Sequence, residues 1–149
     1  MSQFAQIDDQ NIVQRVLVID QAEIDTGNWG DPASFVQTSY NTRGGIYYIP
    51  NTNTPDPDQS KALRKNFAGI GYIYLPYGPE GEGFTIPSPY PSWVMDSFSY
   101  LWVAPVPMPV PNNPPFYDWD EATLSWIKVP APPAPPSNDN PGAAPNVIG

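Results

Sequence analysis

The sequence contains neither cysteine nor histidine, and their absence removes several kinds of chemistry. Without cysteine there can be no disulfide, no thiolate nucleophile, no cysteine-ligated zinc and no iron–sulfur cluster. Without histidine the chain lacks the commonest general base and the commonest ligand of transition metals. Any catalysis would have to use carboxylates, Lys, Tyr, Ser or Thr. We therefore expect a protein that is not an enzyme and that holds no metal and no cofactor.

Charge is also scarce, and most of it is negative. Charged residues make up 14% of the chain, and six Lys or Arg stand against fifteen Asp or Glu, for a formal charge of -9. Nucleic-acid binding relies on basic side chains that neutralise phosphates, and the longest basic run here is Arg64-Lys65. No apolar run approaches the ~18 residues of a membrane span, and the first ten residues are too acidic and polar for a secretory signal. We expect neither nucleic acid nor a membrane as a partner.

Proline and aromatic residues are unusually frequent in the chain. The 149 residues include 22 prolines and 11 glycines, a share that approaches the ~25–30% of disordered chains. However, 13% of the residues are aromatic and five are tryptophan, whereas disordered chains are poor in such residues. Only four prolines precede residue 76. The sequence therefore predicts an all-β protein: a small antiparallel sheet, sandwich or barrel-like domain over 1–86, a proline-punctuated segment with short tryptophan hairpins over 87–129, and an extended proline-rich arm over 130–149.

Alternating and β-branched segments predict the strands of the first half. Residues 4–7 and 12–19 form two strands joined by a turn rich in Asp and Asn. Apolar side chains lie on both faces of the second strand around 16–19, which predicts a central strand covered on both sides. Further strands are expected at 35–40, 46–49, 69–75 and 84–86, and at most a turn or two of helix at 58–66.

A weak repeat relates two tryptophan-containing segments of the second half. Trp93 and Trp102 flank an acidic turn, Trp119 and Trp126 do the same about 26 residues later, and a Pro-x-Pro run follows each pair. The pattern predicts two short hairpins, each with two indoles on one small sheet. Three roles stay open for these indoles: the core of a small domain without disulfides, an interface with a partner protein, or a platform that stacks on sugar rings.

Several acidic motifs resemble functional sites but are better explained as ordinary turns. Asp25-Thr26-Gly27 is the tripeptide of retroviral-type aspartic proteases, yet it leads into a turn-rich loop. The acids at 118–121 could serve a glycosidase, and those at 25–31 or 56–58 could ligate calcium. The glycine-rich loop at 78–83 contains acids that would repel a phosphate. We expect solvated turns in all of these places.

The last twenty residues, 130–149, contain seven prolines and a single charged side chain, Asp139. Such a segment cannot bury enough surface to fold alone, and its prolines favour an extended conformation of about 3.1 Å per residue. It is either an attachment arm, with Val147-Ile148 as a small apolar anchor, or a passive linker. The candidate partner-binding residues of the whole chain are Trp93, Trp102, Trp119, Trp126, Pro130, Pro132, Pro133, Pro135, Pro136, Val147 and Ile148.

Several segments resemble, in the same order, small proteins of tailed phages that infect cyanobacteria and other aquatic bacteria. They are FAQIDDQNIVQRVLVID, QTSYNTRGG, LRKNFAGIGYIY, PSPYPSWV followed by LWVAPVPMP, and YDWDEATLSWIKV. The resemblance covers roughly residues 4–129 and leaves out the proline-rich tail. The family is regarded as virion-associated, so the resemblance implies a setting and supplies no catalytic residues.

From this resemblance and the composition we expect a phage virion structural protein. The expected role is a capsid decoration or cement protein, which binds the assembled head through its β domain and extended arms. Its partners would be the major capsid protein or other virion proteins, and it would be present as a homo-oligomer or in multiple copies. It would be made in the host cytoplasm and located in the virion. The alternative is a tail-fibre or receptor-binding module whose tryptophans bind glycans.

Overall fold

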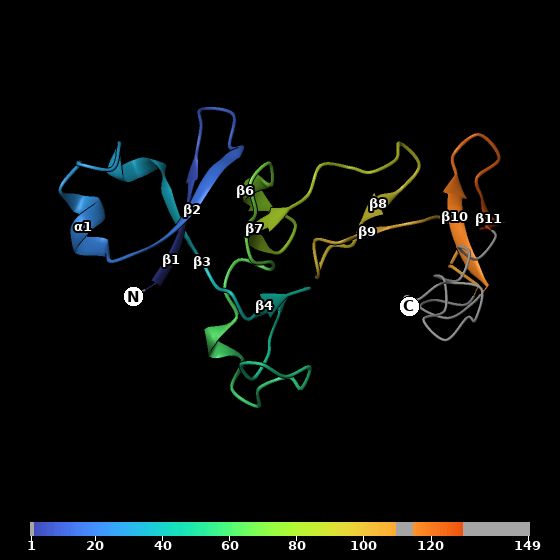
Figure 1. Ribbon diagram of the computed structural model, residues 1–149, viewed down its shortest axis with the longest axis horizontal. Helices are drawn as coiled ribbons and strands as arrows, with labels where there is room; N and C mark the ends of the chain where they lie inside the picture. Colours follow the sequence, from blue (N-terminus) through green and yellow to red (C-terminus); the bar gives the residue numbers. More distant parts are fainter. Residues whose placement is uncertain (1, 110–114, 130–149) are drawn as a thin grey trace, which may run out of the picture. The chain divides into compact units, whose positions relative to one another are not determined.

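A computed structural model describes residues 2–109 and 115–129, and in them almost every regular element is a short antiparallel strand (Figure 1). The strands are β1 (Ser2–Ile7), β2 (Val13–Ile19), β3 (Phe35–Thr38), β4 (Thr42–Arg43), β5 (Ile46–Tyr47), β6 (Ile73–Gly78), β7 (Gly81–Thr85), β8 (Val94–Met95), β9 (Trp102–Val103), β10 (Phe116–Asp120) and β11 (Ser125–Val129). The helical elements are α1 (Gln21–Asp25), η1 (Pro32–Ser34) and η2 (Gln59–Lys61). The prediction of an all-β protein with small antiparallel sheets is confirmed, while the predicted arm over 130–149 lies outside the described residues.

The chain divides into two compact units, Met1–Pro105 and Val106–Gly149. The first unit contains β1 to β9, and the second contains β10 and β11. The first unit thus extends past residue 86, the expected end of the N-terminal domain. The strands β8 and β9, which the sequence groups with the later tryptophan hairpin, belong with the N-terminal strands.

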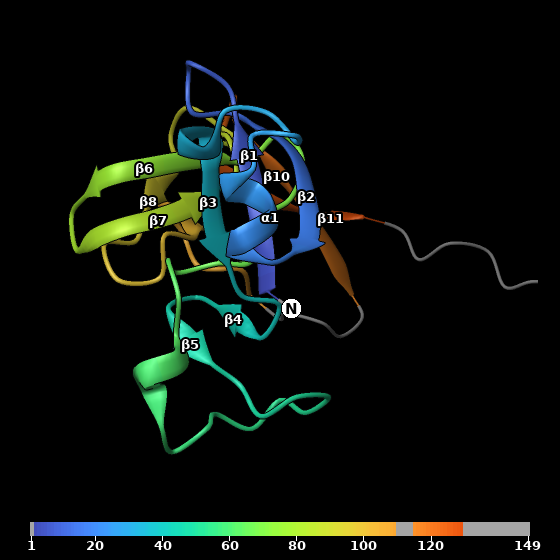
Figure 2. The same ribbon diagram turned by 90° about the vertical axis from the view of Figure 1, so that its left-hand side faces the viewer.

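The main sheet of the first unit has the strand order β2-β1-β3, with antiparallel pairing throughout (Figure 2). Phe4 and Ala5 of the middle strand β1 are both buried, and neighbouring side chains of a strand face opposite sides of the sheet. Ala5 packs in one cluster with Phe84 of β7, and Phe4 packs in another with Ile24 of α1. The β6–β7 hairpin therefore covers one face of β1, and α1 covers the other.

The strand β2 lies at the edge of this sheet, so the prediction of a central position for it is wrong. Val16 and Leu17 do pack against the two clusters, on opposite faces, but Val18 is 63% exposed. An apolar run of this kind shows that both faces contribute to packing, but the order of strands depends on which segments pair along each edge. The central position belongs to β1, whose own sequence has fewer β-branched residues.

The β6–β7 hairpin is joined to the main sheet through the residues at the start of β2. Ile12 forms a β-bridge with Ile73. Val13 N donates a hydrogen bond to Tyr72 O at 2.8 Å, and Gly71 N donates to Val13 O at 2.9 Å. These backbone bonds hold the hairpin where Phe84 can reach Ala5 of β1.

A buried asparagine ties together three separate segments, a task that disulfides perform in many small extracellular proteins. Asn66 Nδ2 donates to Phe84 O at 3.1 Å and to Ser99 O at 2.9 Å. Its Oδ1 accepts a hydrogen bond from Gly44 N at 2.7 Å. One side chain thereby links the β4–β5 turn, β7 and the turn after β8, and its polar atoms are paired as burial requires.

Candidate functional site

The second tryptophan hairpin, β10–β11, has the arrangement that the repeat predicts. Trp119 and Trp126 are directly opposite across the two strands, and their ring centroids are 5.2 Å apart in an edge-to-face geometry of 69°. Trp119 is 8% exposed, and its Nε1 donates to Glu121 Oε1 at 2.9 Å. Trp126 Nε1 donates to Val106 O at 2.7 Å. Edge-to-face pairs are a favourable aromatic geometry, so these two indoles form the small core of their hairpin.

The first tryptophan hairpin, β8–β9, differs from this pattern. Trp102 lies in β9 opposite Met95 of β8, and its Nε1 donates to Ile86 O at 2.8 Å. Trp93 precedes β8, and its ring centroid is 5.3 Å from that of Tyr90. The prediction of two indoles on one small sheet thus holds for Trp119 and Trp126 and is wrong for this hairpin, because Trp93 lies before β8.

The remaining candidate residues belong to the tail. Pro130, Pro132, Pro133, Pro135, Pro136, Val147 and Ile148 lie outside the described residues.

Tyr100 anchors the β8–β9 hairpin to the rest of the first unit. Its side chain is fully buried. Its hydroxyl accepts a hydrogen bond from Glu80 N at 2.8 Å and donates one to Gly81 O at 2.7 Å. The side chain lies so close to Gly78 and Gly83 that a Cβ would come within 2.4 Å of its hydroxyl oxygen at Gly78 and of its ring at Gly83. The tyrosine that packs over them therefore explains these two glycines.

The turn between β8 and β9 is capped by an aspartate. Asp96 Oδ2 accepts hydrogen bonds from Ser99 N at 2.7 Å and from Phe98 N at 3.1 Å. These bonds, the one from Ser99 first, lower the pKa of the Asp96 carboxyl. Tyr100 itself has a φ of +55°, a left-handed conformation that costs energy for a residue other than glycine. The cap and the buried ring together hold this turn in its conformation.

Beyond this anchor the β8–β9 hairpin presents apolar side chains to solvent. Val94 and Val103 are cross-strand partners, and they are 68% and 53% exposed. Phe98 and Leu101 of the connecting turn are also about half exposed. We call these four residues the β8–β9 surface. The sequence alone does not identify either valine as a candidate binding residue. Both lie among prolines and tryptophans, which are the more obvious candidates.

A hollow of about 410 Å³ lies beside this surface, and five of the eleven residues that line it are aromatic. We call it the aromatic groove; its aromatic lining residues are Tyr40, Phe67, Tyr72, Tyr100 and Trp102. Tyr40 is 68% exposed, and its ring centroid is 5.3 Å from that of Phe67. Arg43 is the cationic residue of the lining, and its guanidinium carbon stands 3.8 Å from the Tyr48 ring centroid. The groove joins residues that are up to 62 positions apart, so no local motif could have predicted it.

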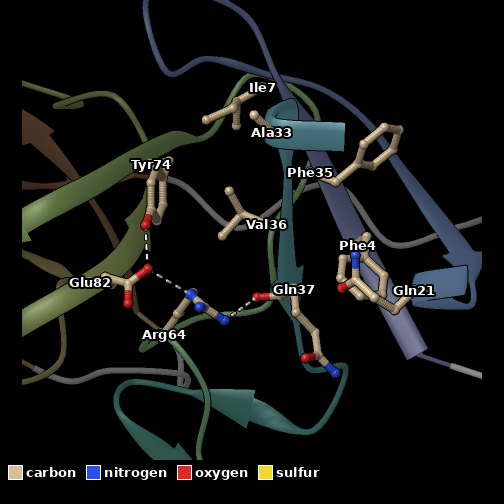
Figure 3. A pocket seen from close by; sticks show the side chains of 10 residues that line it. All are labelled: Phe4, Ile7, Gln21, Ala33, Phe35, Val36, Gln37, Arg64, Tyr74 and Glu82. Atoms are coloured by element: carbon tan, nitrogen blue, oxygen red, sulfur yellow. Dashed lines mark hydrogen bonds and ion pairs between the residues drawn. The ribbon is translucent and has the colours of Figure 1, made fainter. Parts of the chain in front are cut away.

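A second hollow, of about 380 Å³, contains the charged cluster of the first unit. Figure 3 shows the Tyr74 hydroxyl, the Glu82 carboxylate and the Arg64 guanidinium in a chain of contacts that ends on a backbone oxygen of β3. Tyr74 donates to Glu82, Arg64 Nε is 3.0 Å from the same carboxylate oxygen, and Arg64 Nη1 donates to Gln37 O at 3.0 Å.

The electrostatics of this cluster favour a structural role over proton transfer. Burial, together with the bond to Glu82, raises the pKa of Tyr74 to about 12. The hydrogen bonds from Tyr74 and Arg64 lower the pKa of Glu82. Catalytic acids and bases need pKa values near the working pH, whereas these shifts keep Tyr74 protonated and Glu82 ionised. The cluster is therefore a tie between β3, β6 and β7.

The acidic motifs of the N-terminal half are part of turns. Asp25 is the last residue of α1. Asp31 Oδ1 accepts from Ala33 N at 3.0 Å, and Asp58 Oδ1 accepts from Ser60 N at 3.0 Å. In the described part of the chain, no group of three or more Asp or Glu residues is arranged to hold a metal ion. Likewise, no helix within residues 2–109 and 115–129 is long and apolar enough to cross a membrane.

Comparisons with known proteins give no relative for this chain. No family model, no curated protein and no solved structure matches it.

Proposed function

We propose that this protein is a non-enzymatic structural component of a phage virion, a decoration or cement subunit that binds the major capsid protein of the assembled head. The phage setting rests on the ordered motifs over residues 4–129. The proposal needs a surface through which a small acidic protein could adhere to another protein, and the β8–β9 surface supplies one.

The observation that carries the proposal is the exposure of the β8–β9 surface. Val94 and Val103 are paired across the two strands and are more than half exposed, with Phe98 and Leu101 on the adjoining turn. Contiguous exposed apolar side chains on a soluble protein mark interaction sites. Burying such side chains against a partner is favourable by roughly 25 cal/mol per Å² of apolar area.

The rigidity of the hairpin supports the same role. Tyr100 and the Asp96 cap fix the turn from which these side chains project. A surface that is already ordered loses less conformational entropy on binding than a flexible one. A subunit that has to bind many equivalent places on a capsid benefits from such preorganisation.

Binding to heads that lack the protein tests the proposal. We expect Val94→Asp and Val103→Asp to weaken binding about tenfold or more, because a carboxylate would be buried in an apolar contact. Val18→Asp is the matched control, since Val18 is 63% exposed on β2, and it should bind like the unmodified protein. Co-sedimentation with purified heads measures occupancy. Equal occupancy of all three variants would contradict attachment through the β8–β9 surface.

The alternative, a receptor-binding module with a tryptophan glycan platform, is favoured by one observation, the presence of Trp102 in the aromatic groove. The other indoles fit it less well. Trp119 is buried, and the Nε1 atoms of Trp102 and Trp126 are already bonded to backbone oxygens. A module of this kind would bind oligosaccharides through the groove and would not bind bare heads.

A further inference from the structure

The aromatic groove has the chemistry of a site for a polyproline helix. Tyr and Trp rings line it, and Tyr40 is largely exposed at its margin. Grooves lined by aromatic side chains are the usual binding sites for proline-rich segments, because the rings pack against the faces of proline rings. The polyproline helix has no internal hydrogen bonds, so its carbonyl oxygens remain free to accept bonds from groups such as tyrosine hydroxyls and Arg43.

The chain itself contains a segment of matching chemistry just after β11. Residues 130–136 read Pro-Ala-Pro-Pro-Ala-Pro-Pro. A polyproline helix has three residues per turn, so Pro130, Pro133 and Pro136 would share one edge of it and Pro132 and Pro135 the next. The segment 130–136 carries no charge. Arg43, the cationic residue of the groove, already donates to Asn53 Oδ1 at 2.9 Å and stacks on Tyr48, so binding would bury no ionised side chain without a partner.

We propose that Pro130–Pro136 of one copy of this chain binds as a polyproline helix in the aromatic groove of a second copy. The tail of twenty residues spans roughly 60 Å when extended, which is long enough to reach a neighbouring molecule. The contact is heterologous, since a tail on one side meets a groove on the other, and such contacts build rings or extended arrays. This inference extends the proposed attachment to heads by giving neighbouring subunits a link of their own.

Self-association of the full chain in solution tests the proposal without any phage head, so its failure and the failure of head attachment are distinguishable. Sedimentation velocity should show association that increases with protein concentration. We expect Tyr40→Ala to weaken it about tenfold, as loss of an aromatic anchor does at protein interfaces. Tyr77→Ala is the matched control, because Tyr77 is 95% exposed on β6 and does not line the groove; it should leave association unchanged.

The tail is tested with a matched pair of proline variants. Replacing Pro130, Pro133 and Pro136 with Ala should weaken association as much as Tyr40→Ala does. Replacing Pro141 and Pro145 with Ala, outside the repeated run, should have no effect. If the proline segment binds in the aromatic groove, the effects of Tyr40→Ala and of the triple replacement should not multiply. The combined variant should associate much more strongly than the product of the two separate effects predicts, which indicates direct coupling.

Three results would overturn the proposal. The first is a full chain that stays monomeric at every concentration. The second is association that neither Tyr40→Ala nor the triple proline replacement changes. The third comes from NMR: groove resonances that shift with a neutral oligosaccharide but not with an added peptide of residues 130–149 would assign the groove to glycans.

Discussion

The two tryptophan hairpins have similar sequences but different structures. In β10–β11 the strands are five residues long, and the facing indoles of Trp119 and Trp126 form the core. In β8–β9 the strands are two residues long, and the buried anchor is Tyr100 in the turn. Because Tyr100 holds the β8–β9 hairpin against the rest of the first unit, the side chains of Val94 and Val103 can remain exposed to solvent. The comparison shows how one repeat can supply a core in one place and an exposed apolar surface in another.

The largest expected effect is the loss of the tyrosine anchor. Tyr100→Ala should lower the free energy of unfolding of the first unit by about 3–5 kcal/mol, the usual cost of emptying a buried aromatic site. It also leaves Glu80 N and Gly81 O without their hydroxyl partner. Chemical denaturation followed by near-UV circular dichroism measures the change.

Tyr77→Ala controls for the loss of an exposed tyrosine, and it should change stability by no more than about 0.5 kcal/mol. Tyr100→Phe separates the ring from the hydroxyl and should cost about 1–3 kcal/mol. If Tyr100→Ala were as mild as Tyr77→Ala, the anchor would lie elsewhere and the contrast between the hairpins would disappear.

The next largest loss of stability should come from replacing one tryptophan, and its size should differ between the two hairpins. Trp119→Ala should lower the stability of β10–β11 by about 3 kcal/mol, because this indole is buried and paired with Trp126. Trp102→Ala should cost only about 1–2 kcal/mol in β8–β9, since that side chain is half-buried and Tyr100 remains. The amide resonances of each hairpin, followed by NMR in urea, report the two effects separately. Equal losses at the two sites would contradict the difference in anchoring.

Acid should weaken both the Glu82 contacts and the Asp96 cap of the β8–β9 turn. The pKa of Asp96 is lowered in the folded state from its ordinary value of 3.8, so its contribution to stability is present above pH 3.8 and is lost as the pH falls further. Glu82 behaves in the same way below its ordinary value of 4.5. The Ser99 amide resonance reports on the Asp96 cap. Asp96→Asn keeps an acceptor oxygen without the titration, and it should remove the Asp96 part of the acid dependence.

Alkali should act on the charged cluster instead. The pKa of Tyr74 is raised to about 12, so its contribution is complete below pH 10 and is lost as the pH rises from 10 towards 12, where the unfolded chain ionises first. Tyr74→Phe should abolish that loss. Between pH 6 and 8 stability should stay flat, because the chain has no histidine. A large change in stability between pH 6 and 8 would contradict this expectation and would require a carboxylate with a strongly shifted pKa.

The smallest expected effect on stability is that of removing the tail. A chain that ends at Val129 should unfold at the same denaturant concentration as the full chain, since residues 130–149 contain almost no large apolar side chain. Its binding to heads should nevertheless weaken, because a second linked contact raises avidity by roughly 10²–10⁴ where the geometry allows it. Unchanged head binding would make the tail a passive linker.

Sequence patterns predicted local structure well and long-range structure poorly. The β1 and β2 strands, the Asp-rich turn between them and the Trp119–Trp126 pair all follow from residues close together in the chain. The edge position of β2 does not, because it depends on β3 pairing with the other edge of β1. The short helix α1 also escaped prediction, since five residues are too few to show a period.

The candidate site was least predictable of all. No local sequence pattern predicts that Tyr100 is buried. The only related feature of the sequence is the glycine at positions 78 and 83, where a larger residue would clash with the Tyr100 side chain. The aromatic groove collects residues from five separate segments, so only the folded chain brings Tyr40 close to Trp102. Composition could predict that aromatic and proline-rich parts were both important, but not that five separate segments form an aromatic groove.

The amount of this protein in purified virions tests the central claim most directly. Densitometry or quantitative mass spectrometry gives its ratio to the major capsid protein. A decoration subunit should be present at a fixed, high ratio, which should fall with Val94→Asp and stay unchanged with Val18→Asp. A few copies per particle, located at the tail and insensitive to Val94→Asp, would contradict it.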